Sequence, residues 1–131
     1  MKILVGYNGS GACKKALELA KQHAAVWQGR IEVVQAVTRS EPLSYDTIVI
    51  VEQQLAQEVK HLLDGKRGSF ETTLLVGTQN PGEQIVNFAQ AINADEIIIG
   101  SQKRSRIGKF VLGSTTQFVV LNAPCPVVVV K

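Results

Sequence analysis

The stretch NPGEQIVNFAQAINADEIIIG, residues 80–100, holds the strongest structural signals in the chain. Asn80-Pro81-Gly82-Glu83 is a helix start: an Asn cap, a proline in the first turn, and a glutamate able to reach back to the cap. Apolar residues then recur at helical spacing, and Asn93 is expected to end the helix. Ile97-Ile98-Ile99 is short, β-branched and closed by Gly100, which is typical of a buried strand. The stretch therefore predicts a helix that leads into a strand.

The same alternation extends to both ends of the chain. Strands are predicted at residues 3–5, 31–37, 70–76, 97–99 and 127–130. Helices are predicted after Ser10 as far as Gly29, after a loop at 38–46, at 81–92, and from a Ser114 cap to about residue 121. Strands alternating with helices predict a parallel sheet with helices on both faces. The fold class is therefore α/β, an open five-stranded parallel sheet in a single domain over residues 1–131.

Composition narrows the classes of function. The chain of 131 residues is 45% hydrophobic and 19% charged, with a net charge of +3, so bulk nucleic-acid binding is not expected. No apolar run approaches the roughly 18 residues of a membrane span, and no secretory signal opens the chain. Cys13 and Cys125 have no metal or redox spacing, and Cys13 falls on a helix stripe as a core residue. We expect a cytoplasmic protein without membrane or nucleic-acid partners.

Ligands of open parallel sheets bind beyond the carboxyl ends of the strands. Three such segments carry suggestive chemistry: residues 6–11, 36–38 and 100–114. The first has glycines in the order G-x-x-G-x-G, which is not the dinucleotide fingerprint, so an ordinary NAD site is not expected. The third does not match the Walker pattern, because Phe110 follows Gly108-Lys109. An ordinary P-loop NTPase is therefore rejected as well.

Residues 100–114 nevertheless favour an anion site. Gly113-Ser114 opens a helix, whose first amides lack partners and carry positive dipole charge. Glycine allows close approach of a phosphate, and the Ser114 hydroxyl adds a donor. Four basic residues between positions 103 and 109 could complete the charge match. The alternative is that Ser114 only caps the helix and that the basic run is solvated surface.

These residues resemble the universal stress protein family, and the likeness extends over the whole chain. The family signature after the fourth strand is G-x2-G-x9-G-[ST], and Gly100, Gly113 and Ser114 match it. The opening residues 3–10, the stretch 80–99 and the ending 122–127 are also similar to the family. Two positions depart from it: Lys103 stands at the second signature glycine, and Asn8 stands where an aspartate is common.

The resemblance implies the strand order 3-2-1-4-5 of nucleotide-binding α-hydrolase-like folds. It also implies binding of ATP or a related adenine nucleotide, with Mg²⁺ or Mn²⁺ able to bind through the phosphates. The residues expected near the base and ribose are Tyr7, Asn8 and Val37. Those expected near the phosphates are Gly100, Lys103, Gly113, Ser114 and Thr115. Lys103 could either grip the phosphates or obstruct them.

No catalytic set stands out, so a stress-response regulatory protein is expected rather than an enzyme. His23 and His61 fall on polar helix faces and are expected to be solvated, and Asp95-Glu96 lie at the far end of the sheet. Two alternatives stay open: a non-nucleotide-binding member that acts through an unidentified regulatory protein partner, and a slow ATPase. The apolar edge strand expected at residues 127–130 predicts a homodimer through the C-terminal strand. The resemblance implies the same, because members of the family commonly dimerise in this way.

Overall fold

The computed structural model of the chain describes residues 1–39, 43–63, 70–101, 108–109 and 111–131. The strands are β1 (Lys2–Gly6), β2 (Arg30–Thr38), β3 (Phe70–Gly77), β4 (Glu96–Gly100) and β5 (Val127–Val130). The helices are α1 (Gly11–Trp27), α2 (Tyr45–Leu62), α3 (Pro81–Ile92) and α4 (Ser114–Asn122). Lys103 lies outside the described residues.

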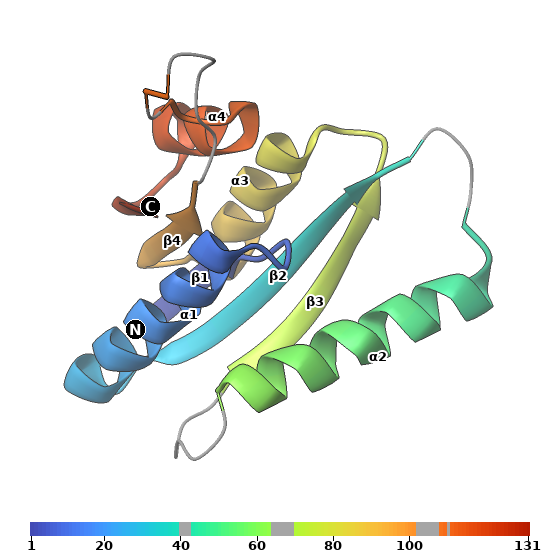
Figure 1. Cartoon of the computed structure of the whole chain (residues 1–131), viewed down its shortest axis with the longest axis horizontal. Helices are drawn as coiled ribbons and strands as arrows, with labels where there is room; N and C mark the ends of the chain where they lie inside the picture. The colour runs from blue at the N-terminus through green and yellow to red at the C-terminus, as the bar shows by residue number, and fades with distance from the viewer. Residues whose placement is uncertain (40–42, 64–69, 102–107, 110) are drawn as a thin grey trace.

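The sheet confirms the predicted fold class. Its order is β3-β2-β1-β4-β5, and each neighbouring pair is parallel (Figure 1). β1 is the central strand, with Val5 opposite Val33 of β2 on one side and opposite Ile98 of β4 on the other. Strand order therefore reverses at β1, and this is the point where a parallel sheet leaves a crevice for a ligand.

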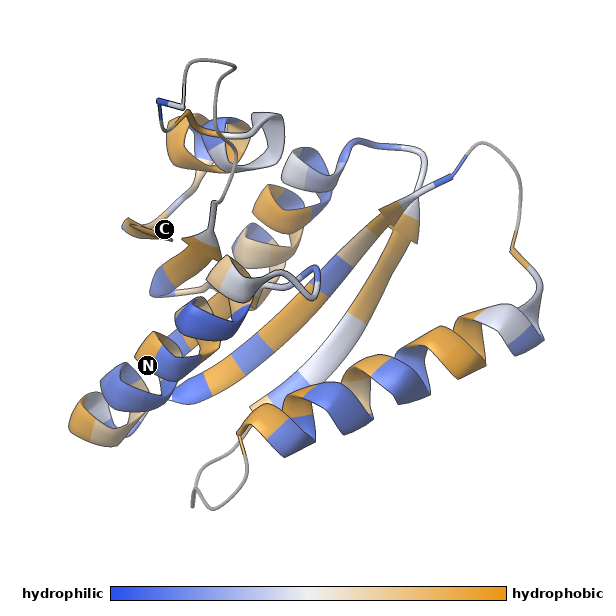
Figure 2. Cartoon of the chain, viewed as in Figure 1, coloured by the Kyte–Doolittle hydropathy of each residue, from blue (hydrophilic) through white to orange (hydrophobic). Residues whose placement is uncertain are grey.

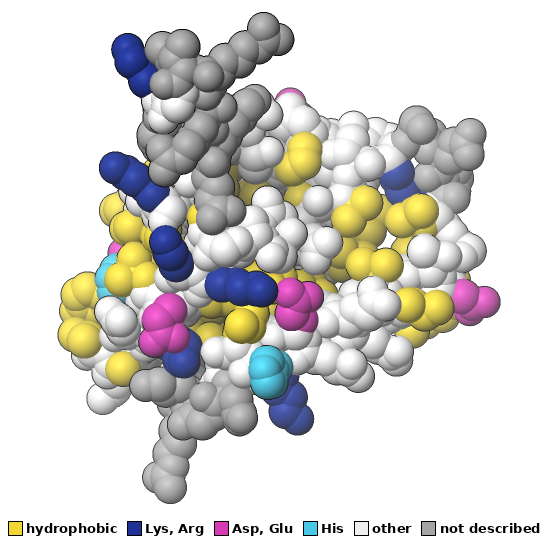
Figure 3. All heavy atoms as spheres, in the orientation of Figure 1, with side chains coloured by type: hydrophobic (Ala, Val, Ile, Leu, Met, Phe, Trp, Pro, Cys, Tyr) yellow, Lys and Arg dark blue, Asp and Glu magenta, His cyan; other side chains and the backbone are white. Residues whose placement is uncertain are grey.

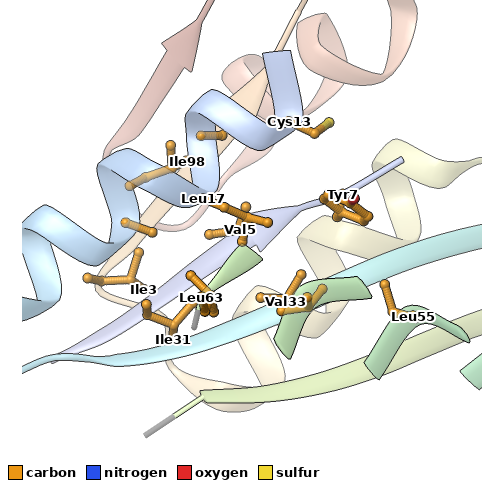
Figure 4. Packing of buried hydrophobic residues seen from close by; sticks show 13 residues of the cluster. Ile3, Val5, Tyr7, Cys13, Leu17, Ile31, Val33, Leu55, Leu63 and Ile98 are labelled. Atoms are coloured by element: carbon orange, nitrogen blue, oxygen red, sulfur yellow. The ribbon is translucent and has the colours of Figure 1, made fainter. Parts of the chain in front are cut away.

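Helices cover both faces of the sheet, because successive strand side chains point to opposite faces. On one face, Val5 and Val33 pack with Leu17 of α1 and Leu55 of α2 (Figure 4). On the other face, Leu4 packs in a second cluster with residues of α3 and α4. Figure 2 shows that β2 and β3 combine hydrophobic stretches with hydrophilic positions, and that the helices carry both kinds of residue. Burial on both faces explains why β1, β4 and β5 are nearly continuous apolar runs.

The helix start that opens the stretch 80–100 forms as predicted. The Glu83 N–H donates to Asn80 Oδ1 at 2.9 Å, and Asn80 Nδ2 donates to Glu83 Oε1 at 2.7 Å. Asn93 adopts the left-handed conformation with φ of 53° and ends α3. Local side-chain chemistry therefore determines both ends of this helix.

Three predicted boundaries were wrong. Gly113 is the N-cap of α4 and Ser114 is its first helical residue, so Ser114 does not cap the helix. α1 ends at Trp27, before the predicted Gly29, and Gln28 caps it in the left-handed conformation. The loop predicted at 38–46 is shorter at both ends, because Thr38 still pairs with β3 and Ser44 caps α2.

The start of α1 packs as predicted, because Cys13 is buried in the core. At the other end of the helix, Trp27 is 54% exposed. His23 was expected to be solvated, but its Nδ1 lies 2.6 Å from Glu96 Oε1, and its ring contacts Trp27 edge to face. The tertiary pairing of α1 with β4 therefore gives His23 a structural partner that helical periodicity does not reveal.

The surface carries charges of both signs, in agreement with the net charge of +3. On the face shown in Figure 3, described basic and acidic side chains lie among one another and among hydrophobic ones. Across the described part of the chain, no helix is long and apolar enough to cross a membrane.

Candidate functional site

A cavity of about 430 Å³ opens at the carboxyl ends of the central strands. Segments from β1, β2 and β4 meet there with the starts of α1, α3 and α4. Its lining consists of Gly6, Tyr7, Asn8, Ser10, Cys13, Val34, Ala36, Pro81, Ile85, Ile99, Gly100, Ser101, Gly113, Ser114, Thr115 and Thr116. The cavity lies at the position where the sheet topology predicts a ligand site.

One wall of the cavity is apolar. Val34 and Ala36 of β2 line it together with Pro81 and Ile85 of α3. These residues belong to the α3/α4 side of the sheet, where Val34 and Ile85 are buried in the same core cluster. A flat apolar group such as a nucleobase could pack against this wall and remove its surface from water.

A second part of the lining is polar and is formed by the first turn of α4. The backbone N–H groups of Ser114, Thr115 and Thr116 have no acceptor among the described residues. The Gly113 N–H reaches Ser101 Oγ at 3.4 Å, and Ser101 itself is buried. Unpaired amides at a helix start, with adjacent hydroxyls, suit an anion.

Gly100 has a packing role beside its place in the lining. A Cβ on Gly100 would lie 2.5 Å from the Ala12 carbonyl carbon and 2.7 Å from the Cys13 backbone nitrogen. β4 and α1 therefore approach each other so closely that no side chain fits between them. This glycine is required for the helix–strand contact, whether or not a phosphate lies beside it.

The turn between β1 and α1 is held by its own side chains. Asn8 Oδ1 accepts from the Ser10 N–H at 3.0 Å and from the Cys13 thiol at 2.9 Å. Ser10 caps α1, and its Oγ accepts from the Cys13 N–H at 3.3 Å. This network fixes the position of Asn8 at the mouth of the cavity.

Tyr7 lies between the cavity and α2. Its side chain is 4% exposed, and its hydroxyl donates to Glu58 Oε1. Burial, and then the bond to the Glu58 carboxylate, raise the pKa of Tyr7 above its ordinary value of 10.0. Tyr7 and Asn8 also line a smaller cavity of about 160 Å³ next to α2. The tyrosine therefore connects the turn after β1 to that helix.

The fold brings together most of the predicted site residues. Those in the lining are Tyr7, Asn8, Gly100, Gly113, Ser114 and Thr115. Val37 is not in the lining, which Ala36 joins instead, and Lys103 lies outside the described residues. The prediction missed Cys13, Ser101 and the wall from α3. The sequence held one usable signal for the choice of Ala36 over Val37. Side chains alternate along a strand, so these two residues point to opposite faces of the sheet.

The sequence profile of the Universal stress protein family matches residues 1–131. The chain belongs to this family. A universal stress protein of Thermus aquaticus is 31% identical over 134 residues, covering 98% of this chain and 97% of the relative. The family resemblance inferred from the loop signature is therefore confirmed.

Solved structures of the family agree with the fold. A universal stress protein from Archaeoglobus fulgidus superposes with a TM-score of 0.85 at 28% identity, covering 100% of this chain and 98% of that one. A structure of the Archaeoglobus fulgidus protein in complex with dAMP has a TM-score of 0.78 at 25% identity, covering 100% and 98% of the two chains. The dAMP complex shows an adenine nucleotide on a universal stress protein.

The described cavity wall of this family member carries neither a carboxylate nor an imidazole. Among the residues that the structure describes, no three His, Cys, Asp or Glu side chains gather as a metal site. Glu58, which lines the smaller cavity, is engaged by the Tyr7 hydroxyl. In the described part of the wall, the polar chemistry is therefore that of backbone amides, hydroxyls, a thiol and the Asn8 amide.

Proposed function

We propose that this universal stress protein is a regulatory protein that binds ATP or a related adenine nucleotide in the 430 Å³ cavity. The observation that carries the proposal is that one cavity is lined both by an apolar wall and by the start of α4, whose first amides have no acceptor among the described residues. A nucleotide has the same division, with a flat base at one end and phosphates at the other. The dAMP complex of a relative supports the same ligand class.

The base and ribose are placed near Tyr7 and Asn8, with the base against the β2 wall. The phosphates are placed at Gly113, Ser114 and Thr115, where the unpaired amides of α4 can donate to them. Val37 is retained as a proposed contact through its backbone, although its carbonyl already accepts from Gln84 Nε2 at 3.2 Å. Gly100, which lines the same cavity, is also placed near the phosphates.

Binding rather than catalysis is the proposed activity. Phosphoryl transfer uses a carboxylate-bound metal and a group that orients the nucleophile, and the described wall supplies neither side chain. A Mg²⁺ or Mn²⁺ ion would therefore be held mainly by the phosphates of the nucleotide itself. The protein's own residues would position the ligand and exclude water.

Calorimetric titration with ATP, ADP and AMP tests this function. The wild type is expected to bind at least one of them, and Gly113→Leu is expected to weaken binding at least tenfold. Gly113 has φ of −66° and ψ of 161°, which any residue can adopt, so a side chain there obstructs the anion site without straining the backbone. Gly77→Ala, outside the lining, is the control. Absence of binding by the wild type, or full affinity in Gly113→Leu, would contradict the proposal.

Lys103 stands at the position of the second signature glycine, so one alternative stays open. In this alternative, the protein acts through protein partners and binds no nucleotide. Titration of Lys103→Gly decides the role of this side chain, which lies outside the described residues. Higher nucleotide affinity in the variant means that Lys103 obstructs the site. Lower affinity means that its cation contributes to phosphate binding.

We further propose that residues 1–131 act as one domain, in the cytoplasm, as a homodimer through β5. β5 is an edge strand whose outer side has no neighbour in the sheet. Leu121 of the adjacent α4 is 74% exposed, which adds apolar surface close to that edge. The free thiols of Cys13 and Cys125 suit a reducing compartment.

A further inference from the structure

Gln84 is a polar side chain buried on α3. It is 8% exposed, and its amide faces two backbone carbonyl groups. Nε2 lies 2.8 Å from the Gln79 carbonyl oxygen and 3.2 Å from the Val37 carbonyl oxygen. A carbonyl oxygen can only accept, so the atom of Gln84 that faces both must be the nitrogen. The two N–H groups of this amide are therefore matched by two acceptors inside the protein.

These bonds join three segments of the chain. Gln84 belongs to the first turns of α3, Val37 lies near the end of β2, and Gln79 lies in the turn between β3 and α3. Thr38 Oγ1 also donates to the Gln79 carbonyl at 2.8 Å, so the end of β2 is tied to this turn a second time. Removal of a buried donor leaves its acceptor unpaired, which is costly. Gln84 thereby holds the end of β2 against the start of α3.

The two elements that Gln84 joins also supply the apolar wall of the 430 Å³ cavity. Ala36 precedes Val37 on β2, and Ile85 follows Gln84 on α3, and both line the cavity. Gln84 itself is not part of the lining. A shift of the end of β2 relative to α3 would change the spacing between Ala36 and Ile85. The amide of Gln84 therefore acts on the wall from outside it.

The polar part of the lining does not use this link. It is formed by the start of α4, which is attached to α3 through a different contact. A Cβ on Gly82 would lie 2.8 Å from Phe118 Cβ, so Gly82 is the point of closest approach to α4. Gly82 and Gln84 are two positions apart, about 200° around the helix, and so face different sides of α3. Loss of the Gln84 bonds is therefore expected to alter the apolar wall and to leave the start of α4 in place.

We propose that Gln84 is a positioning residue for nucleotide binding, which holds the apolar wall at the spacing that a base requires. This inference rests on the proposed function and deepens it. Gln84 does not touch the ligand, and it contributes by keeping β2 and α3 in the binding geometry before the nucleotide arrives. A site held in this way binds more tightly, because binding then has less order to impose.

The test measures nucleotide affinity by calorimetry in the wild type, Gln84→Leu and Gln84→Glu, at about pH 8 and about pH 5. The probe is ATP, ADP or AMP, whichever the wild type binds most tightly. Gln84→Leu keeps a similar volume but removes both donors. Gln84→Glu keeps the shape, but its ionised carboxylate only accepts and cannot bond to a carbonyl. Burial beside two carbonyls raises the pKa of the introduced carboxyl group, and its protonated form donates one hydrogen bond.

Gln84→Leu is expected to bind the nucleotide about tenfold more weakly than the wild type at both pH values. Gln84→Glu is expected to bind about tenfold more weakly at the higher pH and within about threefold of the wild type at the lower pH, because protonation restores a donor. Each dissociation constant is compared with the wild-type value at the same pH, so titration of the phosphate groups cancels. Loss of stability alone would not produce recovery at low pH.

Two variants of the same helix serve as controls. Val86 is 5% exposed in the core cluster on the α3 and α4 side of the sheet and lies outside the lining. Val86→Ala therefore lowers the thermal midpoint without removing a side-chain hydrogen bond. Gln90→Leu makes the same chemical change as Gln84→Leu at an exposed position of α3. Both controls are expected to bind the nucleotide within about twofold of the wild type.

Three results would overturn the inference. They are wild-type affinity in a folded Gln84→Leu, an equal loss of affinity in either control, and a loss in Gln84→Glu that does not recover at the lower pH. If Gln84→Leu does not fold, Gln84→Glu at the two pH values decides alone. If the wild type binds no adenine nucleotide, the proposed function falls together with this inference. If the wild type and the Gln84 variants bind it equally well, only the role of Gln84 falls.

Discussion

At the scale of single residues, the site depends on side chains whose partners lie far away in the chain. The Tyr7 hydroxyl meets Glu58, which is 51 positions further on, while the tyrosine itself lines the 430 Å³ cavity. Asn8, in contrast, is held by donors of its own turn. Hydrogen-bond partners, more than residue type, therefore decide what each residue can do.

Tyr7→Phe is predicted to change how stability depends on pH. The native pKa of Tyr7 lies above 10.0, so the tyrosine contributes stability that is present below pH 10 and is lost as pH rises beyond it. At neutral pH the variant should lose about 1 kcal/mol, the net value of one hydrogen bond. Urea unfolding of both proteins across the alkaline range measures the difference. A difference that stays constant above pH 10 would contradict this account, because the effects of other titrating groups cancel between the two proteins.

At the scale of elements, close backbone approach sets the geometry of the site. α1 lies directly on the end of β4 because Gly100 has no side chain. α4 approaches α3 in the same way, since a Cβ on Gly82 would lie 2.8 Å from Phe118 Cβ. These two contacts set the positions of the helix starts that surround the cavity, so packing and site geometry are coupled.

Gly100→Ala is predicted to destabilise the fold by about 2 kcal/mol, because the added methyl group meets backbone atoms that cannot rotate away. Gly77→Ala is the matched control. Gly77 likewise ends a strand, but the atom nearest to its added Cβ is Gln84 Oε1 at 3.8 Å. Thermal or chemical unfolding compares the two variants. Equal stability of Gly100→Ala and Gly77→Ala would show that α1 can move away from β4 at no cost.

At the scale of the whole molecule, the sheet leaves β3 and β5 as its two edges. The Pro126 carbonyl, just before β5, accepts from the Ile97 N–H of β4 at 3.0 Å. The Val130 carbonyl accepts from the Ser101 N–H, just after β4, at 2.7 Å. Backbone groups alternate in direction along a strand, so Val127 and Val129 direct theirs to the open side. An apolar strand of this kind is suited to pairing with a second copy.

The protein is predicted to be a dimer at micromolar concentration, and Val129→Pro is predicted to shift it toward monomer. Proline removes an outward N–H while leaving the bonds to β4 in place. Light scattering measures the mass, and circular dichroism verifies that the variant is folded. A wild-type monomer at that concentration would refute assembly through β5, and a folded Val129→Pro dimer would place the interface elsewhere.

The sequence by itself determined the fold class, the order of elements and the ends of α3. These features follow from local signals: continuous apolar runs, helical spacing, and the cap formed by Asn80 and Glu83. It also identified the loop ends that form the polar wall, because a glycine followed by a hydroxyl residue at a helix start has local anion chemistry. Local energetics decide such features, so they can be recognised without the tertiary structure.

Only the tertiary structure decided which residues share the cavity and what each contributes. Ser101, Cys13 and the wall from α3 enter the lining because separate elements converge there, and Ala36 replaces Val37 through strand alternation. Gly100 proved to be a packing residue, since its constraint comes from α1, more than 80 positions earlier in the chain. The pairing of Asn8 depends on two donors whose geometry exists only in the folded turn. Contacts between distant segments are not encoded in local periodicity, and this is the physical reason that the sequence indicated which loops line the cavity but not how their side chains are paired there.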